Sequence, residues 1–142
     1  MALPKLNTQT FELNVPSTDE KVKYRPFLVK EEKILLQAQE GERKEMFTAL
    51  NDVVRACTFD KVDIDKLPSF DIEYMFLKIR AKSVGEKVKL NLAFPGDEKV
   101  KVSTEVDLMK VEVEVGEKHT NKFNLTDNVS VIMQYPTMKT FV

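Results

Sequence analysis

The sequence predicts an α+β fold, because strand-like periodicity occurs towards both ends of the chain and helix-like periodicity fills the middle. Apolar and polar residues alternate over residues 10–26 and over much of residues 87–135, which is the pattern of half-buried strands. Residues 30–84 instead carry apolar residues at the spacing of amphipathic helices. Strands and helices are thus segregated along the chain, which argues against the alternating order of a parallel sheet.

The composition is that of a folded domain with one core. The 142 residues are 42% hydrophobic, which excludes a disordered or collagen-like chain. Twenty-two basic and 23 acidic residues leave a net charge of −1, so nothing indicates a general affinity for nucleic acid or anionic membrane. The sequence contains neither a secretion signal nor an apolar run of membrane-spanning length. We therefore expect one domain over residues 1–142, made in a cytosol and without a membrane partner.

The first predicted element is a β-hairpin over residues 10–26. Residues 11–15 and 21–25 alternate between apolar and polar side chains, and Pro16–Asp19 between them has the composition of a four- to five-residue loop. Pro26 lacks the N–H group that a continuing strand would donate, so the second strand should end there.

The middle of the chain predicts three helices. The first covers Lys30–Gln39 and breaks at Gly41, and the second covers Glu42–Cys57 with one continuous apolar stripe. We expect Ser69 to cap the third helix, because a serine side chain accepts from first-turn N–H groups. Gly85 should lie just after the end of this helix, because glycine tolerates the left-handed conformation found there.

The third helix carries so much apolar surface that we expect it to form the centre of the core. Replacing Leu77 on this helix with alanine should lower the free energy of unfolding by about 2–5 kcal/mol. Six residues on apolar stripes or inward strand faces should be buried: Leu50, Val54, Phe70, Leu77, Leu90 and Val102.

Residues 87–135 predict antiparallel strands. Two long alternating runs, 88–94 and 100–106, flank the turn sequence Pro95–Asp97 and predict a second hairpin. Further runs with the same period predict strands at 111–115, 123–125 and 129–135.

The sequence offers little material for catalysis or for a metal site. His119 is the only histidine and Cys57 the only cysteine, whereas a zinc site needs about four ligands in a defined geometry. We expect His119 to be a solvated loop residue and Cys57 to be a buried structural thiol. The acidic loop Asp60–Asp65 lacks the ligand spacing of an EF-hand. We therefore expect no catalytic residues, no metal and no cofactor.

Five short runs carry a resemblance to a known family: Leu3–Leu6, Tyr24–Lys33, Leu67–Tyr74, Ser83–Glu86 and Tyr135–Thr137. Through these runs the chain resembles the T4-type bacteriophage baseplate proteins, in particular their baseplate hub subunits and hub-assembly chaperones. The resemblance implies a non-enzymatic protein that acts through contacts with other phage tail or baseplate hub proteins. It also implies a location in the bacterial host cytoplasm during assembly or in the tail baseplate of the virion. Homo-oligomerisation stays open.

Members of this family continue with helical sequence beyond the Tyr-Pro-Thr motif. This chain ends at Val142. We therefore expect it to be a shortened relative or a form whose C-terminal part has been removed. If partner binding resides in that part, the residues present here form the scaffold.

The junction between the first hairpin and the first helix is the candidate partner-binding surface. It comprises Arg25, Phe27 and the exposed side of Lys30 to Lys33, and arginine and aromatic residues are enriched at hot spots of protein interfaces. The alternative is structural: Arg25 pairs with a carboxylate of its own chain and Phe27 fills the core. Both interpretations are open at this point.

A nucleic-acid-binding module is the alternative function. Its candidate surface is the pair of lysine-bearing strands within residues 87–101, with Lys87, Lys89, Lys99 and Lys101. Acidic residues are interspersed with these lysines, and the interleaving of aromatic residues that base stacking needs is absent. Binding of this kind would weaken as the salt concentration rises.

Overall fold

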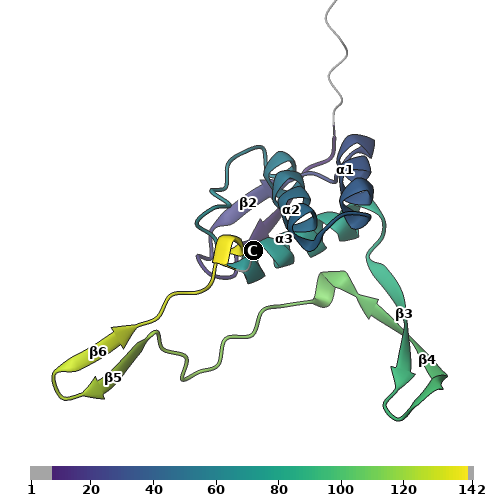
Figure 1. Cartoon of the computed structure of the whole chain (residues 1–142). Helices are drawn as coiled ribbons and strands as arrows, with labels where there is room; N and C mark the ends of the chain where they lie inside the picture. The colour runs from purple at the N-terminus through teal and green to yellow at the C-terminus, as the bar shows by residue number, and fades with distance from the viewer. Residues whose placement is uncertain (1–7, 141–142) are drawn as a thin grey trace, which may run out of the picture.

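The computed structural model describes residues 8–140. Three helices form a compact body, and two β-hairpins project from it in different directions (Figure 1). The elements in chain order are β1 Phe11–Asn14, β2 Lys21–Tyr24, α1 Val29–Gln39, α2 Arg43–Cys57, α3 Ser69–Ser83, β3 Lys87–Phe94, β4 Asp97–Asp107, η1 Leu108–Lys110, β5 Lys122–Thr126, β6 Val129–Ile132 and η2 Met138–Thr140, where η marks a 3-10 turn. The described strands form three antiparallel pairs, β1–β2, β3–β4 and β5–β6, so the predicted α+β class is confirmed.

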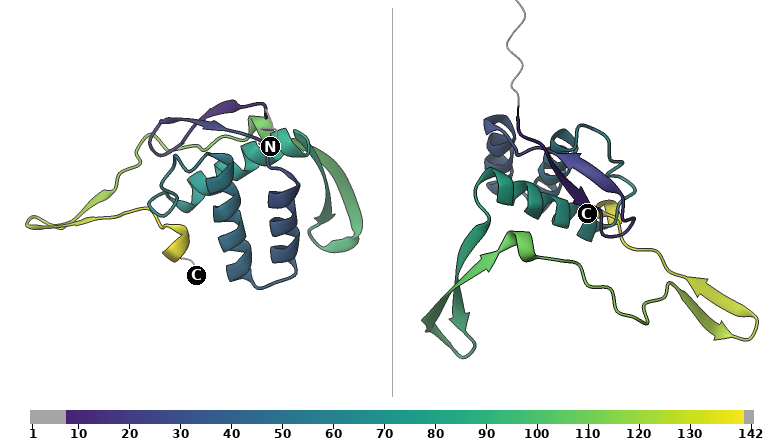
Figure 2. Two further views of the ribbon diagram at one scale, coloured as in Figure 1. Left: turned by 90° about the horizontal axis from the view of Figure 1, so that it is seen from above. Right: turned by 180° about the vertical axis from the view of Figure 1, so that it is seen from behind.

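The core lies where the β1–β2 hairpin packs on α2 and α3. Helices α1 and α2 lie side by side, and α3 runs across them (Figure 2). The N–H group of Arg25, just after β2, donates to the carbonyl of Cys57 at the end of α2, at 3.0 Å. The buried apolar residues of this cluster are Leu13, Val15, Val22, Tyr24, Val53, Val54, Cys57, Ile64, Ile72, Met75, Ile79 and Met138.

The helical part of the core prediction is correct for one residue and overstated for three. Val54 is fully buried. The half-buried residues are Leu50, Phe70 and Leu77. Helix α3 instead turns Ile72, Met75 and Ile79 fully inward, at the spacing of three and four residues that defines one helix face. The apolar surface of α3 is broad, and packing against α2 selects this face.

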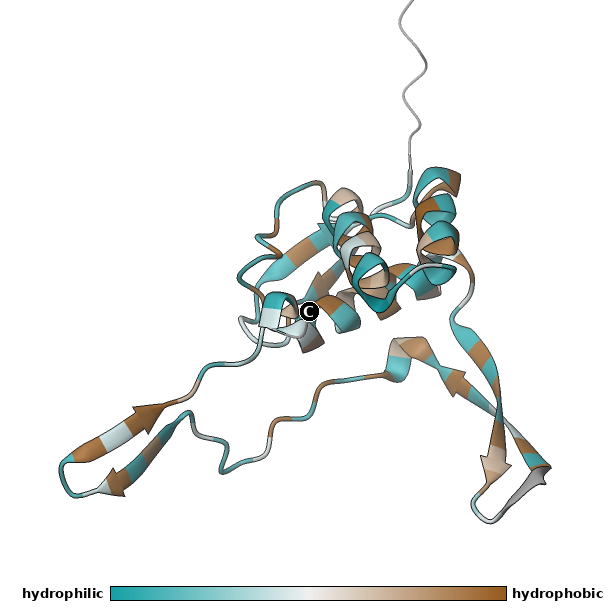
Figure 3. Cartoon of the chain, viewed as in Figure 1, coloured by the Kyte–Doolittle hydropathy of each residue, from teal (hydrophilic) through white to brown (hydrophobic). Residues whose placement is uncertain are grey.

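The prediction that Leu90 and Val102 are buried is wrong. Leu90 is 40% exposed and Val102 is 55% exposed. Strands β3 and β4 do form the expected hairpin, with Leu92 opposite Val102. However, this hairpin leaves the helical body, and apolar residues recur along it away from the core (Figure 3). The alternating pattern identifies the strands without saying what covers their apolar face.

The two ends of α3 differ in how well they match the sequence. Ser69 is not the cap: Pro68 occupies the N-cap position, and Ser69 is the first helical residue. The Ser69 N–H group is bound instead by the carbonyl of Pro136, at 3.1 Å, so the returning C-terminal segment satisfies it. At the other end, Gly85 has a φ of 146° just after the C-cap residue Val84, which explains why glycine follows the helix.

Residues 111–115 do not form the predicted strand. They are extended, but no strand pairs with them among residues 8–140. The carbonyl of Val111 accepts a hydrogen bond from Lys78 of α3 instead, at 2.8 Å. A side chain of the helical body therefore holds this segment in place of a β-ladder. The strands expected at 123–125 and 129–135 form as β5 and β6 and pair with each other, although β6 ends at Ile132 and not at Tyr135.

Residues 112–136, here called the distal arm, leave the body beside Lys78 and return to it at the start of α3 (Figure 1). The arm contains β5 and β6, so it is an excursion with its own secondary structure and not a plain loop. A short β-bridge between Pro68 and Thr137 marks its return.

Candidate partner-binding surfaces

Arg25 of the strand-to-helix junction forms a nearly buried ion pair with Glu31. The Arg25 Nη2 atom lies 2.9 Å from Glu31 Oε1, and the two side chains are 13% and 8% exposed. The other carboxylate oxygen of Glu31 accepts from the Leu28 N–H group at 2.8 Å, so Glu31 also caps the first turn of α1. Burial acts to raise the pKa of the Glu31 carboxyl, but the hydrogen bonds from Arg25 and the Leu28 N–H outweigh it, and the pKa is lowered.

The other junction residues divide into an inward and an outward group. Phe27 is half-buried against the core, and its N–H group donates to Ser83 Oγ at 2.9 Å. Lys30 and Lys33 are exposed. Arg25 and Phe27 thus have the contacts that the structural interpretation requires, while the two lysines face solvent. Binding of a partner by this surface stays a prediction.

Cys57 is buried beside the same ion pair, as the sequence predicts. The Arg25 Nη1 atom lies 3.9 Å from its sulfur. Burial raises the pKa of the Cys57 thiol to about 11, so it is protonated at neutral pH and is a poor nucleophile.

Lys78 fixes the start of the distal arm, a role that its position near the end of a helix did not suggest. Lys78 is only 5% exposed. Its ammonium group donates to three backbone carbonyls, those of Leu108 at 3.2 Å, Met109 at 2.7 Å and Val111 at 2.8 Å. All three donors of the ammonium group therefore have an acceptor. Burial lowers the pKa of Lys78, although the nearby carboxylates act in the opposite direction.

The end of the arm is fixed by aromatic contacts and an ion pair. Tyr135 meets Phe70 of α3 edge to face, with ring centroids 5.0 Å apart. Beyond the arm, Lys139 lies 3.1 Å from Asp65. Both ends of the arm are therefore attached to α3 or to the loop before it.

His119 is exposed, as predicted, but its ring has a specific contact. It stacks on Tyr135 with the ring planes 3° apart, and its Nε2 atom lies 2.5 Å from the Tyr135 hydroxyl. Together with Phe123 and Met133, these residues line a largely apolar hollow of about 380 Å³ at the base of the β5–β6 hairpin. His119 and Tyr135 are 16 positions apart, which hides this pair from local sequence patterns.

Both projecting hairpins expose apolar side chains. The cross-strand pairs of β3 and β4 place one set of alternating residues on the same face, and the β5–β6 hairpin repeats this arrangement around the pair Phe123–Val131. Contiguous exposed apolar surface of this kind marks sites of association in soluble proteins. The exposed residues are Leu90, Leu92, Phe94, Val100 and Val102 on the first hairpin and Phe123, Leu125, Val129, Val131 and Ile132 on the second.

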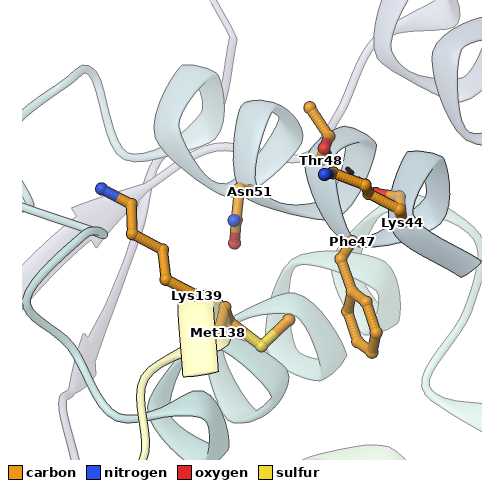
Figure 4. Close-up of a pocket in the computed structure, with 6 residues that line it drawn as sticks. All are labelled: Lys44, Phe47, Thr48, Asn51, Met138 and Lys139. Atoms are coloured by element: carbon orange, nitrogen blue, oxygen red, sulfur yellow. Dashed lines mark hydrogen bonds between the residues drawn. The ribbon is translucent and has the colours of Figure 1, made fainter. Parts of the chain in front are cut away.

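A second hollow lies between α2 and η2 (Figure 4). It has a volume of about 330 Å³ and is lined by Phe47 and Asn51 of α2 and Met138 of η2, with two lysines at its rim. The Oδ1 atom of Asn51 is buried there without a hydrogen-bond partner in the described structure. Among the residues that the structure describes, no group of three or more His, Cys, Asp or Glu side chains is placed to hold a metal ion.

The lysine-bearing face proposed for nucleic acid lies on β3 and β4. Lys87 is paired with Glu105 across the hairpin at 2.8 Å, and Lys89 stands opposite the same glutamate. Acidic and basic groups thus share this face, and binding of nucleic acid by it stays a prediction. No helix in the described part of the chain combines the length and apolar composition needed to cross a bilayer.

Comparison with protein families gives a match over most of the chain. The family model described as "T4 bacteriophage base plate protein" matches residues 7–142. None of the curated proteins and none of the solved structures matches the chain.

Proposed function

Because the chain belongs to the T4 bacteriophage base plate protein family, we propose that it is a non-enzymatic component or assembly chaperone of the baseplate hub that acts through contacts with other baseplate proteins. The family supports a place in the phage tail, and the exposed hairpins supply surface for such contacts. As a chaperone it would act in the bacterial host cytoplasm during assembly, and as a hub component it would remain in the virion.

The observation that carries this proposal is the exposed apolar face of the distal arm. An isolated two-stranded hairpin is at best marginally stable in water, so β5–β6 gains stability when another surface covers it. One face of the β5–β6 hairpin presents Phe123 beside Val131, and the opposite face presents Asn124 beside Ser130. An apolar centre with a polar surround is the usual composition of a protein interface.

The fixed ends of the arm support the same proposal. Lys78 places its ammonium on three carbonyls at one end, and Phe70 packs against Tyr135 at the other. A buried lysine is uncommon and needs such partners to offset its lost hydration. The arm is therefore held in a defined direction from α3, as a presented binding element requires.

Co-purification with the other hub proteins of the same phage tests the proposal. The double variant Phe123→Ser/Val131→Ser should reduce capture of a hub protein at least tenfold, because it removes the apolar centre of the arm. The matched control is Asn124→Ala/Ser130→Ala, which alters the other face of the same hairpin and should leave capture intact. Equal capture by both variants would place the contact elsewhere.

Mass spectrometry of purified virions separates the two roles. A hub component is retained in mature particles in fixed ratio to the other baseplate proteins, and an assembly chaperone is absent from them but present in infected-cell extracts.

A further inference from the structure

The outer edge of β4 is a free strand edge on a projecting hairpin. In the described structure β4 pairs with β3 alone, so the backbone N–H and C=O groups along its other side have no strand partner. The hairpin projects from the helical body (Figure 1). Residues 100–103 and Glu105 of β4 are exposed, whereas Thr104, Val106 and Asp107 are half-buried. Such an edge is a template for pairing with another chain, and it is usually blocked in monomeric proteins.

The charges along β4 are arranged so that the strand complements itself. On one face of the strand, Lys101, Ser103 and Glu105 follow one another in steps of two residues. When two such strands pair antiparallel about Ser103, Lys101 of each copy stands opposite Glu105 of the other. Opposite charges that face each other across an antiparallel pair stabilise it, whereas like charges destabilise it.

The other face of β4 fits the same pairing. With Ser103 at the centre, Val102 meets Thr104 of the second copy, and Val100 meets Val106. These are β-branched residues, which pack well against one another across strands. We therefore propose that β4 pairs antiparallel with β4 of a second copy of this chain about Ser103, joining two hairpins into a four-stranded sheet.

Other arrangements of the same strands are less favourable. Centring the pair on Lys101 or on Glu105 places like charges opposite each other, and so does parallel pairing in register. Strand β3 has no such complement, because its charged residues are Lys87 and Lys89 only. The charge pattern thus favours β4 and the antiparallel direction, and it excludes Lys101 and Glu105 as centres.

The existing contacts leave room for the new ones. Glu105 already accepts from Lys87 of its own hairpin at 2.8 Å, but both side chains are largely exposed. Exposed pairs of this kind contribute little, and a carboxylate can accept from two cations at once. Residues 87–107 contain four lysines and four acidic residues, so two hairpins do not repel each other through net charge.

A two-fold pairing accounts for the marginal stability of the hairpin. Two strands alone are rarely stable in water, whereas four strands share three ladders. The pairing is isologous, so it closes at two copies and does not lead to open polymerisation through this edge. It is independent of any contact with other baseplate proteins, because it needs only this chain.

Disulfide trapping tests the geometry. In the Ser103→Cys variant the two cysteines meet at the two-fold axis with Cα atoms about 4.5–5.5 Å apart, which suits a disulfide. Mild oxidation should convert most of the protein to a covalent dimer. The matched control is Asn91→Cys, which lies directly opposite Ser103 on β3 and on the same face, yet would be about 14 Å from its copy. Cys57 is buried and should not react.

Charge exchange tests the recognition. By sedimentation equilibrium, Lys101→Glu and Glu105→Lys should each weaken the dimer about tenfold, because each creates two like-charge pairs. The double variant K101E/E105K restores both pairs between the copies but places a lysine at position 105 opposite Lys89 of its own hairpin. It should therefore bind more tightly than either single variant without reaching wild-type affinity. Circular dichroism confirms that each variant is folded.

Three results would overturn the proposal. These are a monomeric wild-type protein up to high micromolar concentration, equal cross-linking of the two cysteine variants, and a dimer that neither single charge variant weakens. A folded double variant that stays as weak as the single variants would also overturn it, since general surface effects and not pairing would then explain the loss.

Discussion

The helical body and the projecting hairpins use the same residue types in opposite ways. In the body, Arg25 and Glu31 form a nearly buried ion pair, and Ile79 is fully buried. On the hairpins, Leu92 and Phe123 lie at positions of equally regular alternation, yet each is at least half exposed. The body therefore contains the core, and the hairpins present apolar surface that other chains can cover.

The largest expected difference between the two regions comes from one substitution made in each. Ile79→Ala should lower the free energy of unfolding by about 2–5 kcal/mol, because Ile79 is fully buried in α3. Ile132→Ala, on a residue that is 70% exposed, should change it by less than about 0.5 kcal/mol. Leu77→Ala, at a half-buried position of α3, should fall between them. Urea denaturation of the three variants measures this, and equal losses at Ile79 and Ile132 would contradict the contrast.

The buried ion pair of the junction should give the next largest effect. Arg25→Ala leaves the Glu31 carboxylate buried without its cation and should lower the free energy of unfolding by about 3 kcal/mol. The control is the double variant Lys30→Ala/Lys33→Ala, whose exposed side chains should change stability little. If the control lowers co-purification with hub proteins but not the melting temperature, the outward side of the junction binds a partner. Normal melting of Arg25→Ala would show that the pair is not structural.

The attachment of the distal arm should depend on a single ammonium group. Lys78→Met keeps the apolar stem but leaves three carbonyls without their donor, so we expect a loss of about 2 kcal/mol and faster proteolysis within residues 112–121. Lys82→Met is the matched control one turn later, where an i,i+4 pair with Glu86 is lost and about 0.3–0.5 kcal/mol is expected. An arm that resists protease in Lys78→Met would show that other contacts hold it.

The smallest expected effect concerns two carboxyl groups of the body. As the pH falls, one should lower the free energy of unfolding and the other should raise it. The pKa of Glu31 is lowered, so its contribution to stability is full above the usual carboxyl range and is lost as the pH falls through the lowered pKa. Burial raises the pKa of Asp71 despite hydrogen bonds from Ser17, so stability gained from its protonation appears as the pH falls through the raised pKa. Glu31→Gln should therefore flatten the acid limb of a stability curve, and Asp71→Asn should steepen it. The same slope in both variants would contradict these assignments.

Local periodicity was enough to predict most elements, because each depends on neighbours in sequence. The two long hairpins, the three helices and the break near Gly41 follow from alternation, helical spacing and turn residues. The same signal failed for Val111–Val115, where extended backbone is held by Lys78 and not by a strand. It also failed for the burial of Leu90, because alternation is identical whether the covering surface belongs to the same chain or to another.

The candidate site was only partly accessible from the sequence for a related reason. The Tyr24–Lys33 run suggested that Arg25 either binds a partner or pairs internally, and only the fold brings Glu31 onto it. The Lys78 contacts and the His119–Tyr135 stack join residues that lie far apart in the chain. Such contacts depend on tertiary structure and leave no pattern over a short window.

The positions at which the distal arm joins α3 bear on how fast and how tightly it could bind. Lys78 and Pro68 are ten residues apart on or beside one helix, which separates the two roots of the arm by about 15 Å along a rigid rod. The loop-closure entropy of the arm is therefore spent during folding and not at the moment of association. A partner that docks on the arm needs to restrict few further degrees of freedom, so more of the contact energy remains as affinity. Because β5–β6 is a two-stranded hairpin of marginal stability, the ordering that remains on association is confined to the hairpin, and this ordering sets how far the association rate falls below the collision limit.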